Sequence, residues 1–577
     1  MNPDGNSHIR AYLEPFQTQD YKPFFSALDI RIAEVTLRKW AESLDPEQKF
    51  WAAWTFALAH RATRSGNIFV DLDQLESSDQ SMQSPDPNPG FRESLQTQFK
   101  NDLNGNPESP IYWDAPQRIY VRKFFELESQ LAREFFNLAR SKSHNSGAPF
   151  AAPDDRLSVE QRRVVESVLS RKLTLLNGGP GTGKTSTTQQ LLKAIFRKNS
   201  EARVSFLAPT GKAVARLQNS VGIPATEQGH QVSIQTIHRF LQETGSSGDY
   251  SLIPRFPTQP DYLVVDEVSM VDVSLMHKLL MALPSTCHIL LMGDIHQLAS
   301  VQPGAVFSDV FNSLNENSDC TLELTKNFRF ERSSTVMELC QSIKSAEFER
   351  LKSHLFNDSP QVQFLDHENP DLVRSMDAWI EKTVLTALQL SNPSKALARA
   401  QSSMLLCALN KGKWGVEHFN SWIRNKCAQY FRNTTQTHFW MPIMVLENDY
   451  NLQLFNGDFG LLKQEVSDQP TYSEICYFER EDGSQLEVPA TSLPRFQPAY
   501  ATTIHKSQGS EADNVLIILP PEDSPLLTRE LLYTAFSRTR DHLTVVGNLE
   551  GLKTCINRPT QRNSRLAERI EALFAEE

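Results

Sequence analysis

The sequence predicts an α/β protein with two parallel-sheet domains, a small inserted β domain and a mostly helical N-terminal domain. Apolar strand-like runs alternate with helical stretches from residue 157 onward, and a second such set begins near residue 403. Short strand-like pieces with turn signals occupy about 440–500 between them. Alternation of this kind indicates parallel strands joined by crossover helices, with ligands at the carboxyl ends of the strands. A chain of 577 residues is also too long for one hydrophobic core.

The first 156 residues differ from the rest in their composition and in their pattern of apolar residues. Residues 20–75 have helical periodicity that ends at Gly66, and 76–110 are rich in Ser, Asp, Asn, Pro and Gln, which predicts a mobile excursion. The segment 119–136 predicts a short strand that runs into an amphipathic helix. We therefore expect an N-terminal domain over 1–140 and a linker over 141–156, where the composition is that of a linker.

The alternating region divides into two domains. The first, 157–330, contains apolar runs at 173–178, 204–209, 262–267 and 288–294, with a small hairpin insertion expected at about 240–260. The second, 331–577, contains runs at 403–409, 515–520 and 543–547. Its stretch at about 440–500 predicts a small β-barrel inserted into the second α/β domain.

The composition disfavours several classes of protein. The chain is 40% hydrophobic and 22% charged, and it has no run of 18 or more apolar residues, so we expect no membrane span. The seven cysteines are dispersed with no C-x-x-C pair, which disfavours a zinc ribbon or iron–sulfur cluster and fits reduced thiols in the cytoplasm. The N-terminus lacks the pattern of a secretory signal. The net charge of −11 argues only weakly against nucleic-acid binding, because that requires a local basic groove.

A phosphate-binding loop follows the apolar run at 173–178. Residues 178–185 read GGPGTGKT and lead into a helical stretch, which matches G-x-x-x-x-G-K-[ST]. Glycines let backbone N–H groups surround phosphate oxygens, and the helix N-terminus adds a favourable dipole. Lys184 is expected to reach the β- and γ-phosphates of ATP, and Thr185 to supply a hydroxyl to Mg²⁺. The expected nucleotide-binding residues of this loop are Gly178, Gly179, Pro180, Gly181, Thr182, Gly183, Lys184, Thr185 and Ser186.

Two further strand ends carry acidic or amide side chains. YLVVDEVSMVD places Asp266 and Glu267 directly after a buried strand. Asp266 suits a metal ion, directly or through water, and Glu267 suits the activation of the attacking water. LMGDIHQL places Asp294 and Gln297 after the next strand, where a neutral amide can contact the γ-phosphate or the water; a loop cap is the alternative for Gln297.

Two arginines suggest a second contribution to this chemistry. Arg329 in LTKNFRF and Arg538 in YTAFSRTR could each neutralise the charge that develops during ATP hydrolysis. Taken singly, each is more simply a surface salt-bridge residue. If Lys184 and Arg538 reach one nucleotide, ATP binds in a cleft between domains that opens or closes upon hydrolysis.

The order of these motifs resembles superfamily 1 helicases of the 5′→3′ branch, and the RecD family within it. The match runs through 157–550 and includes LSVEQRRVV, LAPTGKAVARL, TIHRFL, GDIHQLASVQPG, NDYNLQLFNGDFG and ATTIHKSQGSEADNV. The resemblance implies two RecA-like motor domains, an SH3-like inserted barrel and Gln161 as the reader of adenine. It also implies that five residues contact single-stranded DNA or couple it to the nucleotide: Thr210, His238, Thr503, His505 and Ser507.

The N-terminal segments 57–75 and 111–128 resemble the RecD N-terminal region more loosely. In that family this region docks the motor onto RecB and RecC partners, so the resemblance implies a heterotrimer that processes double-strand breaks. The helices could instead form a private core. No carboxylate cluster typical of a metal nuclease is evident, so exonuclease activity is expected only of the assembled complex. Departures from the family pattern are small: Ser537 and Thr539 flank Arg538 where Thr and Ala are usual.

Alternatives remain open at this point. A free-standing RecD-type helicase would carry tandem helix–hairpin–helix repeats, which are not evident in the sequence, and the helicase part of a conjugative relaxase would need a tyrosine nucleophile and a histidine metal cluster. A non-catalytic scaffold subunit with a degenerate ATPase fold is the remaining alternative. The intact set of Lys184, Thr185, Asp266, Glu267, Gln297 and Arg538 argues against a degenerate site.

Overall fold

The computed structural model describes residues 25–40, 46–72, 109–114, 117–141, 157–221, 232–243, 259–326, 334–357, 359–449, 451–466, 474–480 and 484–576. Most of the expected excursion 76–110, nearly all of the linker 141–156, most of the hairpin insertion at about 240–260, and Arg329 lie outside these residues.

The first parallel sheet has six strands in the order β6-β5-β7-β8-β4-β9. Every neighbouring pair in it is parallel. Four of its strands coincide with the predicted apolar runs, whereas β6 and β9 were not predicted. The strands are β4 (Leu173–Gly178), β5 (Val204–Ala208), β6 (Val232–Thr236), β7 (Tyr262–Val265), β8 (His288–Gly293) and β9 (Thr321–Leu324).

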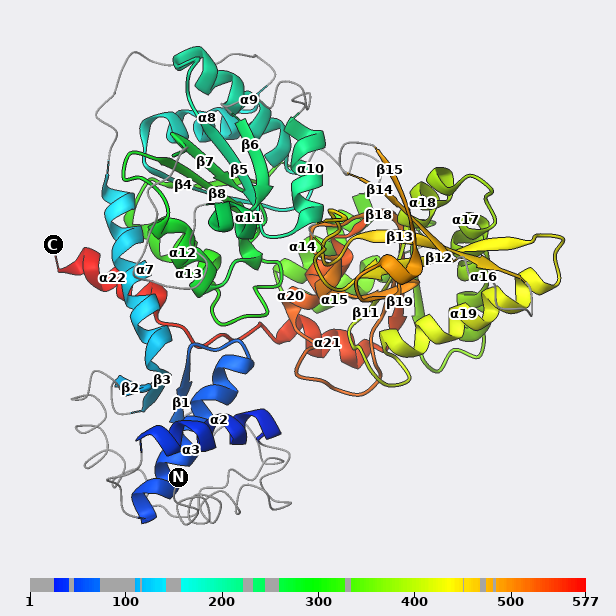
Figure 1. Ribbon diagram of the computed structural model, residues 1–577, viewed down its shortest axis with the longest axis horizontal. Helices are drawn as coiled ribbons and strands as arrows, with labels where there is room; N and C mark the ends of the chain where they lie inside the picture. The colour runs from blue at the N-terminus through cyan, green and yellow to red at the C-terminus, as the bar shows by residue number, and fades with distance from the viewer. Residues whose placement is uncertain are drawn as a thin grey trace.

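Helices cover both faces of this sheet (Figure 1). One face packs against α8 (Val159–Ser170), α9 (Lys184–Lys198) and α10 (Gly211–Val221). The other face packs against α11 (Ile237–Glu243), α12 (Val273–Met281) and α13 (Val306–Asn317), and the short 3-10 helix η3 (Val268–Met270) follows β7. Strand β4 is buried along its whole length, as expected for a central strand covered on both faces.

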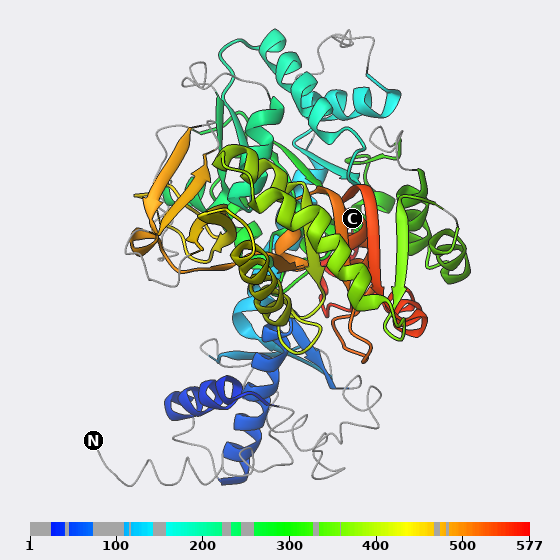
Figure 2. The ribbon, with the colours of Figure 1, turned by 90° about the vertical axis from the view of Figure 1, so that its right-hand side faces the viewer.

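The second parallel sheet has five strands in the order β10-β19-β18-β11-β17. It contains β10 (Val362–Asp366), β11 (Ser403–Cys407), β17 (Ala501–Thr503), β18 (Ala512–Ile518) and β19 (Thr539–Gly547). One face packs against α14 (Ser334–Lys344), α15 (Phe348–Leu355), α20 (Arg529–Phe536) and α21 (Leu549–Asn557). The opposite core includes α16 (Leu372–Ile380), a π-helical turn η4 (Glu381–Leu385), α17 (Thr386–Leu388), α18 (Pro393–Gln401) and α19 (Val416–Arg432). Figure 2 looks onto this half of the molecule.

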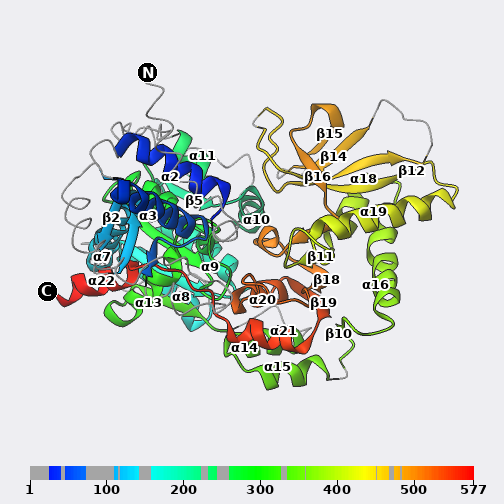
Figure 3. The ribbon, with the colours of Figure 1, turned by 90° about the horizontal axis from the view of Figure 1, so that it is seen from below.

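An antiparallel sheet is inserted between α19 and β17, at the position where the sequence predicted a separate β unit. Its strand order is β15-β14-β13-β12-β16. The strands are β12 (His438–Val445), β13 (Phe459–Glu465), β14 (Ile475–Glu479), β15 (Gln485–Pro489) and β16 (Phe496–Pro498), with the 3-10 helix η5 (Ala490–Ser492) before β16. Figure 3 shows this sheet beside α18 and α19. Its apolar face joins the core beneath α18 and α19.

The N-terminal part combines two helices with a small sheet. Helices α2 (Ala27–Trp40) and α3 (Pro46–Arg64) pack together, and the antiparallel sheet β1-β3-β2 contains β1 (Phe69–Asp71), β2 (Ile111–Asp114) and β3 (Arg118–Val121). Of these strands the sequence predicted only β3. The strand-to-helix transition near residue 121 was predicted correctly, because β3 runs directly into α7 (Arg122–Arg140).

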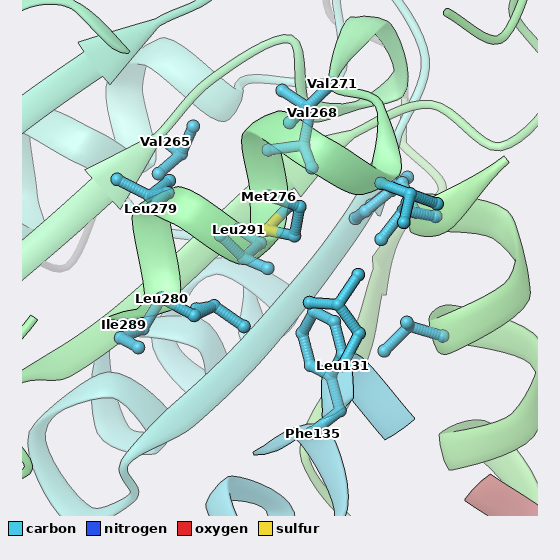
Figure 4. Packing of buried hydrophobic residues seen from close by; sticks show 14 of the residues in the cluster. Leu131, Phe135, Val265, Val268, Val271, Met276, Leu279, Leu280, Ile289 and Leu291 are labelled. Atoms are coloured by element: carbon cyan, nitrogen blue, oxygen red, sulfur yellow. The ribbon is translucent and has the colours of Figure 1, made fainter. Parts of the chain in front are cut away.

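Helix α7 belongs to the core of the first parallel sheet. Leu131 and Phe135 are fully buried against β7 and β8 and against α12, and Figure 4 shows them facing Met276, Leu280 and Leu291. Beside α7 lies α22 (Leu566–Ala575), which the chain reaches only after leaving the second sheet. In Figure 1 this returning segment crosses beneath the first sheet. The N-terminal part, the first sheet and the C-terminus therefore form one continuous packed body.

Candidate active site between the two parallel sheets

The loop between β4 and α9 has the backbone geometry that phosphate binding requires. Gly181 has φ 79° and Gly183 has φ 88°, a left-handed conformation that glycine adopts at little cost. The loop is braced by the Thr182 hydroxyl, which donates to the Gly179 carbonyl at 2.8 Å. Helix α9 begins at Lys184, so the first turn, with Thr185 and Ser186, points its free N–H groups toward the loop.

Two side chains at this loop are held by local hydrogen bonds. The Lys184 ammonium donates to the Gly178 carbonyl and lies 3.5 Å from the Gly179 carbonyl, so it already lies over the loop. Gln161 caps α8 in a reciprocal pair with Ser158. Its amide nitrogen donates to the Ser186 hydroxyl at 3.0 Å and lies 3.4 Å from the Gly183 carbonyl. Gln161 therefore lies beside the loop.

The carboxylate pair follows β7 at the same edge of the sheet. Asp266 accepts a hydrogen bond from the backbone N–H of Glu267 at 2.9 Å. Glu267 is 8% exposed and has φ 53°, which a residue other than glycine adopts only when its surroundings hold it there. Burial first, and then the charge of Asp266, raise the pKa of the Glu267 carboxyl. The positive charges of Lys184, Arg538 and Arg216 oppose that rise.

Arg538 comes from the second parallel sheet, yet it acts on the same carboxylate. Its guanidinium is 1% exposed and donates to the carbonyls of Thr534 at 3.0 Å and Ser510 at 3.2 Å. Its charge and that of Lys184 both lower the pKa of Glu267, so both cations lie near this carboxylate. The structure thus brings Lys184, Glu267 and Arg538 together from two separate sheets.

Asp294 joins the two sheets directly. The Tyr533 hydroxyl, on α20, donates to Asp294 Oδ2 at 2.9 Å, and the Gln297 amide donates to the same oxygen at 3.2 Å. Burial alone would raise the pKa of the Asp294 carboxyl, but the charges of Lys344 and Lys184 hold its pKa below the ordinary value. Gln297 is 5% exposed, and its buried Oε1 has no hydrogen-bond partner within the described part of the chain.

Sequence reasoning missed Lys344 and Tyr533. A Cβ atom added to Gly179 would lie 3.0 Å from the Tyr533 hydroxyl and 3.6 Å from the Lys344 nitrogen, so both side chains lie against the phosphate loop. The Lys344 ammonium also lies 5.0 Å from the centre of the Tyr533 ring. Tyr533 stands five residues before Arg538, but no spacing distinguishes it. Lys344 ends α14 and has no motif around it.

Hydrogen bonds between backbone and side-chain groups also connect the two parallel sheets. The Leu298 N–H donates to the Thr534 hydroxyl at 2.9 Å, and the Gln508 amide donates to the Leu298 carbonyl at 2.8 Å. Arg216, on α10, lies 3.8 Å from Glu267 and 3.3 Å from Glu511, which directly precedes β18. Arg216 therefore connects the carboxylate at the nucleotide loop to the second sheet.

Of the five residues assigned to DNA by resemblance, His238 lies on α11 and Thr503 ends β17, whereas Thr210 directly precedes α10 and His505 and Ser507 lie in the 3-10 turn after β17. Thr210 caps α10, and Thr503 accepts from the Lys506 N–H in the turn after β17. His238 is exposed on α11. Burial first, and then the charge of Arg562, lower the pKa of His505. Ser507 is 2% exposed and donates to the Ile504 carbonyl, so its hydroxyl is engaged within the turn.

The side-chain oxygen atoms near the phosphate loop determine whether Mg²⁺ could bind there. Among the described residues, no group of three or more His, Cys, Asp or Glu side chains could hold a metal ion. The Thr185 hydroxyl and the Asp266 carboxylate are oxygen ligands of the kind Mg²⁺ takes alongside substrate phosphates. In the same described ranges no helix is long and apolar enough to cross a membrane, and all seven cysteines are buried and unpaired.

Charged groups from both sheets thus lie near one carboxylate beside the phosphate loop. The fold and the site together define a two-domain nucleoside-triphosphate motor with RecA-like sheets.

Comparison with known proteins agrees with this class. Residues 161–303 match a family described as AAA domain, and 498–546 match the UvrD-like helicase C-terminal domain. The RecBCD enzyme subunit RecD of Mycobacterium tuberculosis is 31% identical over 569 residues, which cover 94% of this chain and 95% of that protein. The ATP-dependent RecD2 DNA helicase of Deinococcus radiodurans is 26% identical, over 92% of this chain and 70% of that protein. A structure of Pif1 helicase from Bacteroides with ADP-AlF3 and ssDNA covers 74% of this chain and 98% of its own, at 16% identity and a TM-score of 0.41.

With that extent of identity, the chain belongs to the RecD family. It is an ATP-dependent DNA helicase of superfamily 1.

Proposed function

We propose that the chain moves 5′→3′ along single-stranded DNA by hydrolysing ATP in the cleft between its two parallel sheets, as the RecD-like subunit of a RecBCD-type complex. The observation that carries the proposal is the convergence of Lys184 and Arg538, from different sheets, on Glu267. A motor of this class must change the distance between two DNA-gripping domains in each hydrolysis cycle, and groups shared across the cleft supply that link. The polarity rests on family resemblance.

In the proposed chemistry, water attacks the γ-phosphorus, the bond to the bridging oxygen breaks, and ADP leaves. Glu267 takes the proton of the water, a role that its raised pKa favours because the carboxylate becomes a stronger base. Lys184 and Arg538 neutralise the charge that develops on the phosphate oxygens. Gln297, whose Oε1 is free of other partners among the described residues, orients the water or senses the γ-phosphate. Arg329 is proposed as a further contact to the phosphates.

Thr185 and Asp266 are the residues that would hold Mg²⁺. Asp266 Oδ1 is already engaged by the Glu267 N–H, which leaves the other oxygen to face a ligand. When bound, the ion would offset the negative charge of the phosphates. Gln161 would contact adenine, and the loop residues 178–186 would surround the phosphates.

We assign DNA contact to Thr210, His238, Thr503 and His505, which lie at or just after the carboxyl ends of β5, β6 and β17. Ser507 acts there by stabilising the turn, since its hydroxyl donates to the Ile504 carbonyl. The segment 1–140 is proposed to dock RecB-like and RecC-like subunits, and 157–330 and 331–577 to be the motor domains, with an SH3-like barrel over 440–500. Buried reduced thiols support a cytoplasmic setting.

The test of the motor is Lys184→Gln in the purified chain. Loss of the ammonium should lower DNA-stimulated ATPase activity at least about 100-fold while the melting temperature stays unchanged. Lys193→Gln, at an exposed position on the same helix α9, is the control and should keep full activity. Undiminished ATPase activity in Lys184→Gln would remove the motor assignment.

The assignment to a complex has its own test. The native chain should co-purify with RecB-like and RecC-like subunits, and it should unwind duplexes with 5′ tails but not those with 3′ tails. Recovery as a lone, active helicase would instead favour a free-standing enzyme.

A further inference from the structure

Arg216 lies between two buried carboxylates that belong to different sheets. It is carried by α10, on the side of the first sheet that faces the second (Figure 1). Its Nη1 atom lies 3.8 Å from Oε1 of Glu267, and its Nη2 atom lies 3.3 Å from Oε1 of Glu511. The two glutamate side chains are 10% and 4% exposed. One guanidinium therefore faces the base of the nucleotide site and an acidic group of the second sheet at the same time.

The contact with Arg216 affects what the Glu267 carboxylate can do. Within the described ranges, Arg216 makes the one ion pair of Glu267. A carboxylate that accepts hydrogen bonds from a guanidinium has its lone pairs engaged and its orientation fixed. Glu267 needs a free lone pair to take the proton of the attacking water. A close contact with Arg216 would therefore oppose hydrolysis, and the observed 3.8 Å is longer than a hydrogen bond.

Glu511 is attached to the part of the second sheet that carries Arg538. The carbonyl of Ser510, the residue before Glu511, accepts a hydrogen bond from the Arg538 guanidinium at 3.2 Å. The N–H of Ala512, the residue after it, donates to the Arg538 carbonyl at 3.0 Å. Glu511 and Arg538 therefore approach the first sheet together when the two sheets close.

A second arginine holds the Glu511 carboxylate in place. Arg540, on β19, places its Nε atom 3.6 Å from Oε2 of Glu511 and its Nη1 atom 3.6 Å from Oδ1 of Asp513. Arg216 and Arg540 approach different oxygens of Glu511, so they do not compete for it. The second sheet thus offers Arg216 an acceptor whose position is already fixed.

The two carboxylates compete for one guanidinium, and the inference drawn from this rests on the proposed function, whose regulation it describes. We propose that Arg216 is a positioning residue that pairs with Glu267 when the two sheets are apart and with Glu511 when they are closed. While Arg216 holds Glu267, hydrolysis is slow. Once Glu511 binds Arg216, the Glu267 carboxylate is free to accept the proton of the water.

The segments that carry Arg216 and Glu511 are those to which DNA contact is assigned. Thr210 caps α10, and Glu511 lies four residues after Ser507 of the turn after β17. A cavity of about 300 Å³ opens between these segments beside Lys212, so they can shift without disrupting a close-packed core. DNA bound to both segments would therefore favour the closed arrangement, and ATP hydrolysis without DNA would stay slow.

Steady-state ATPase kinetics of the full chain, with and without an oligothymidine of about 20 nucleotides, test the exchange. Arg216→Gln should raise kcat without DNA about 10-fold, because Glu267 loses the cation that holds it. Glu511→Gln should lower kcat with DNA about 10-fold, because Arg216 then stays on Glu267, and should change kcat without DNA less than about 2-fold. The KM for ATP should change less than about 3-fold in both variants, since neither side chain is assigned to the nucleotide.

Further variants separate this role from a merely structural one. The double variant Arg216→Gln with Glu511→Gln should behave like Arg216→Gln alone, because Glu511 acts only through Arg216. Arg216→Lys retains a cation and should keep the low kcat of the parent without DNA. The matched controls are Arg197→Gln on α9 and Glu550→Gln on α21, both at exposed positions, and they should leave both rates unchanged.

The outcomes distinguish the role of Arg216 from the proposed function. An unchanged or lower kcat without DNA in Arg216→Gln, or a double variant as slow with DNA as Glu511→Gln, would overturn the exchange while the motor stands. If melting shows that Arg216→Gln is unfolded, Glu511→Gln decides, and an equal loss of kcat with and without DNA in that variant would overturn the exchange. A parent chain whose ATPase does not respond to DNA at all would overturn the proposed function itself.

Discussion

Arg538 shows, at the residue scale, how the cleft holds its charges. A guanidinium keeps its charge in any protein, so burial to 1% exposure requires compensation. Two carbonyls, the Ser537 hydroxyl and the charge of Glu267 supply it. Asp294 is compensated in a similar way by Lys344, Lys184 and Tyr533. The affinity of the two sheets for each other is therefore tied to the groups that would contact the phosphates.

Tyr533→Phe tests this link. It removes the one hydroxyl that donates from α20 to Asp294, a hydrogen bond to a charged group that contributes about 1.5–3 kcal/mol. We expect kcat/KM of the DNA-stimulated ATPase to fall roughly 10-fold, since closure of the cleft is weakened. The control is Tyr430→Phe, at a 42% exposed position of α19, which should leave kinetics unchanged. Equal kinetics for both variants would show that the contact does not contribute to closure.

At the scale of elements, hydrophobic burial on both faces explains why the central strands were predictable. Strands β4, β5 and β7 are buried at every residue, so their sequences are continuous apolar runs. Helix α7 is a different case. Its apolar stripe was visible in the sequence, but its partners were not, because β7, α12 and β8 lie more than 120 residues further along the chain.

Phe135→Ala measures how much the packing of α7 contributes to the stability of the core of the first sheet. Phe135 is 0% exposed within the core of the first sheet, so the substitution should reduce the free energy of unfolding by about 3–5 kcal/mol. Phe356→Ala removes the same ring where it is 57% exposed and should cost less than about 1 kcal/mol. Chemical denaturation of both variants gives the comparison. A loss below about 1 kcal/mol for Phe135→Ala would mean that α7 is not part of this core.

At the scale of the whole molecule, the C-terminal segment ties distant parts of the chain together. The Arg562 guanidinium donates to the carbonyls of Ser65 and Ser300, and it occupies the space where a Cβ of Gly66 would lie. Further on, Arg569 pairs with the buried Glu128 of α7 at 3.0 Å. The segment that leaves the second sheet thus fastens the N-terminal part to the first sheet.

Asp309, which lies where the C-terminal segment packs against the first sheet, makes the stability of the fold depend on pH. Burial raises the pKa of its carboxyl to about 7, with the charge of Glu128 adding to the rise and the Ser564 hydroxyl opposing it. The folded chain therefore holds a proton there that the unfolded chain releases above about pH 4. Stability falls as pH rises from about 4 to about 7, and the full penalty is present above pH 7.

Asp309→Asn should remove that penalty. Three pKa units set an upper limit of about 4 kcal/mol, and we expect the variant to exceed the parent in stability by roughly 1–3 kcal/mol at pH 8. The difference should shrink toward zero near pH 4.5. Denaturation curves for both proteins across this range give the answer, and a pH-independent difference would exclude Asp309 as its source.

Much of the nucleotide site could be predicted, because its residues follow strands in short motifs. The loop at 178–185 and the carboxylates after β7 lie where the pattern placed them. Lys344, Tyr533 and Arg216 could not be found in this way. Arg216 and Tyr533 lie within the quoted motifs LAPTGKAVARL and YTAFSRTR, but nothing in those motifs marks the two side chains, and Lys344 has no motif around it. Each acquires its role only by facing the other sheet.

Local sequence patterns were sufficient to predict the two parallel sheets, the position of the inserted β unit and the side chains at the strand ends. This was possible because hydrophobic periodicity and phosphate-loop chemistry are local properties of the chain. The three-dimensional fold was needed to see which groups share the cleft, that the C-terminal segment returns to α7, and that a cavity opens beside Lys212. Those features depend on contacts between residues that are hundreds of positions apart, and no local pattern encodes such contacts.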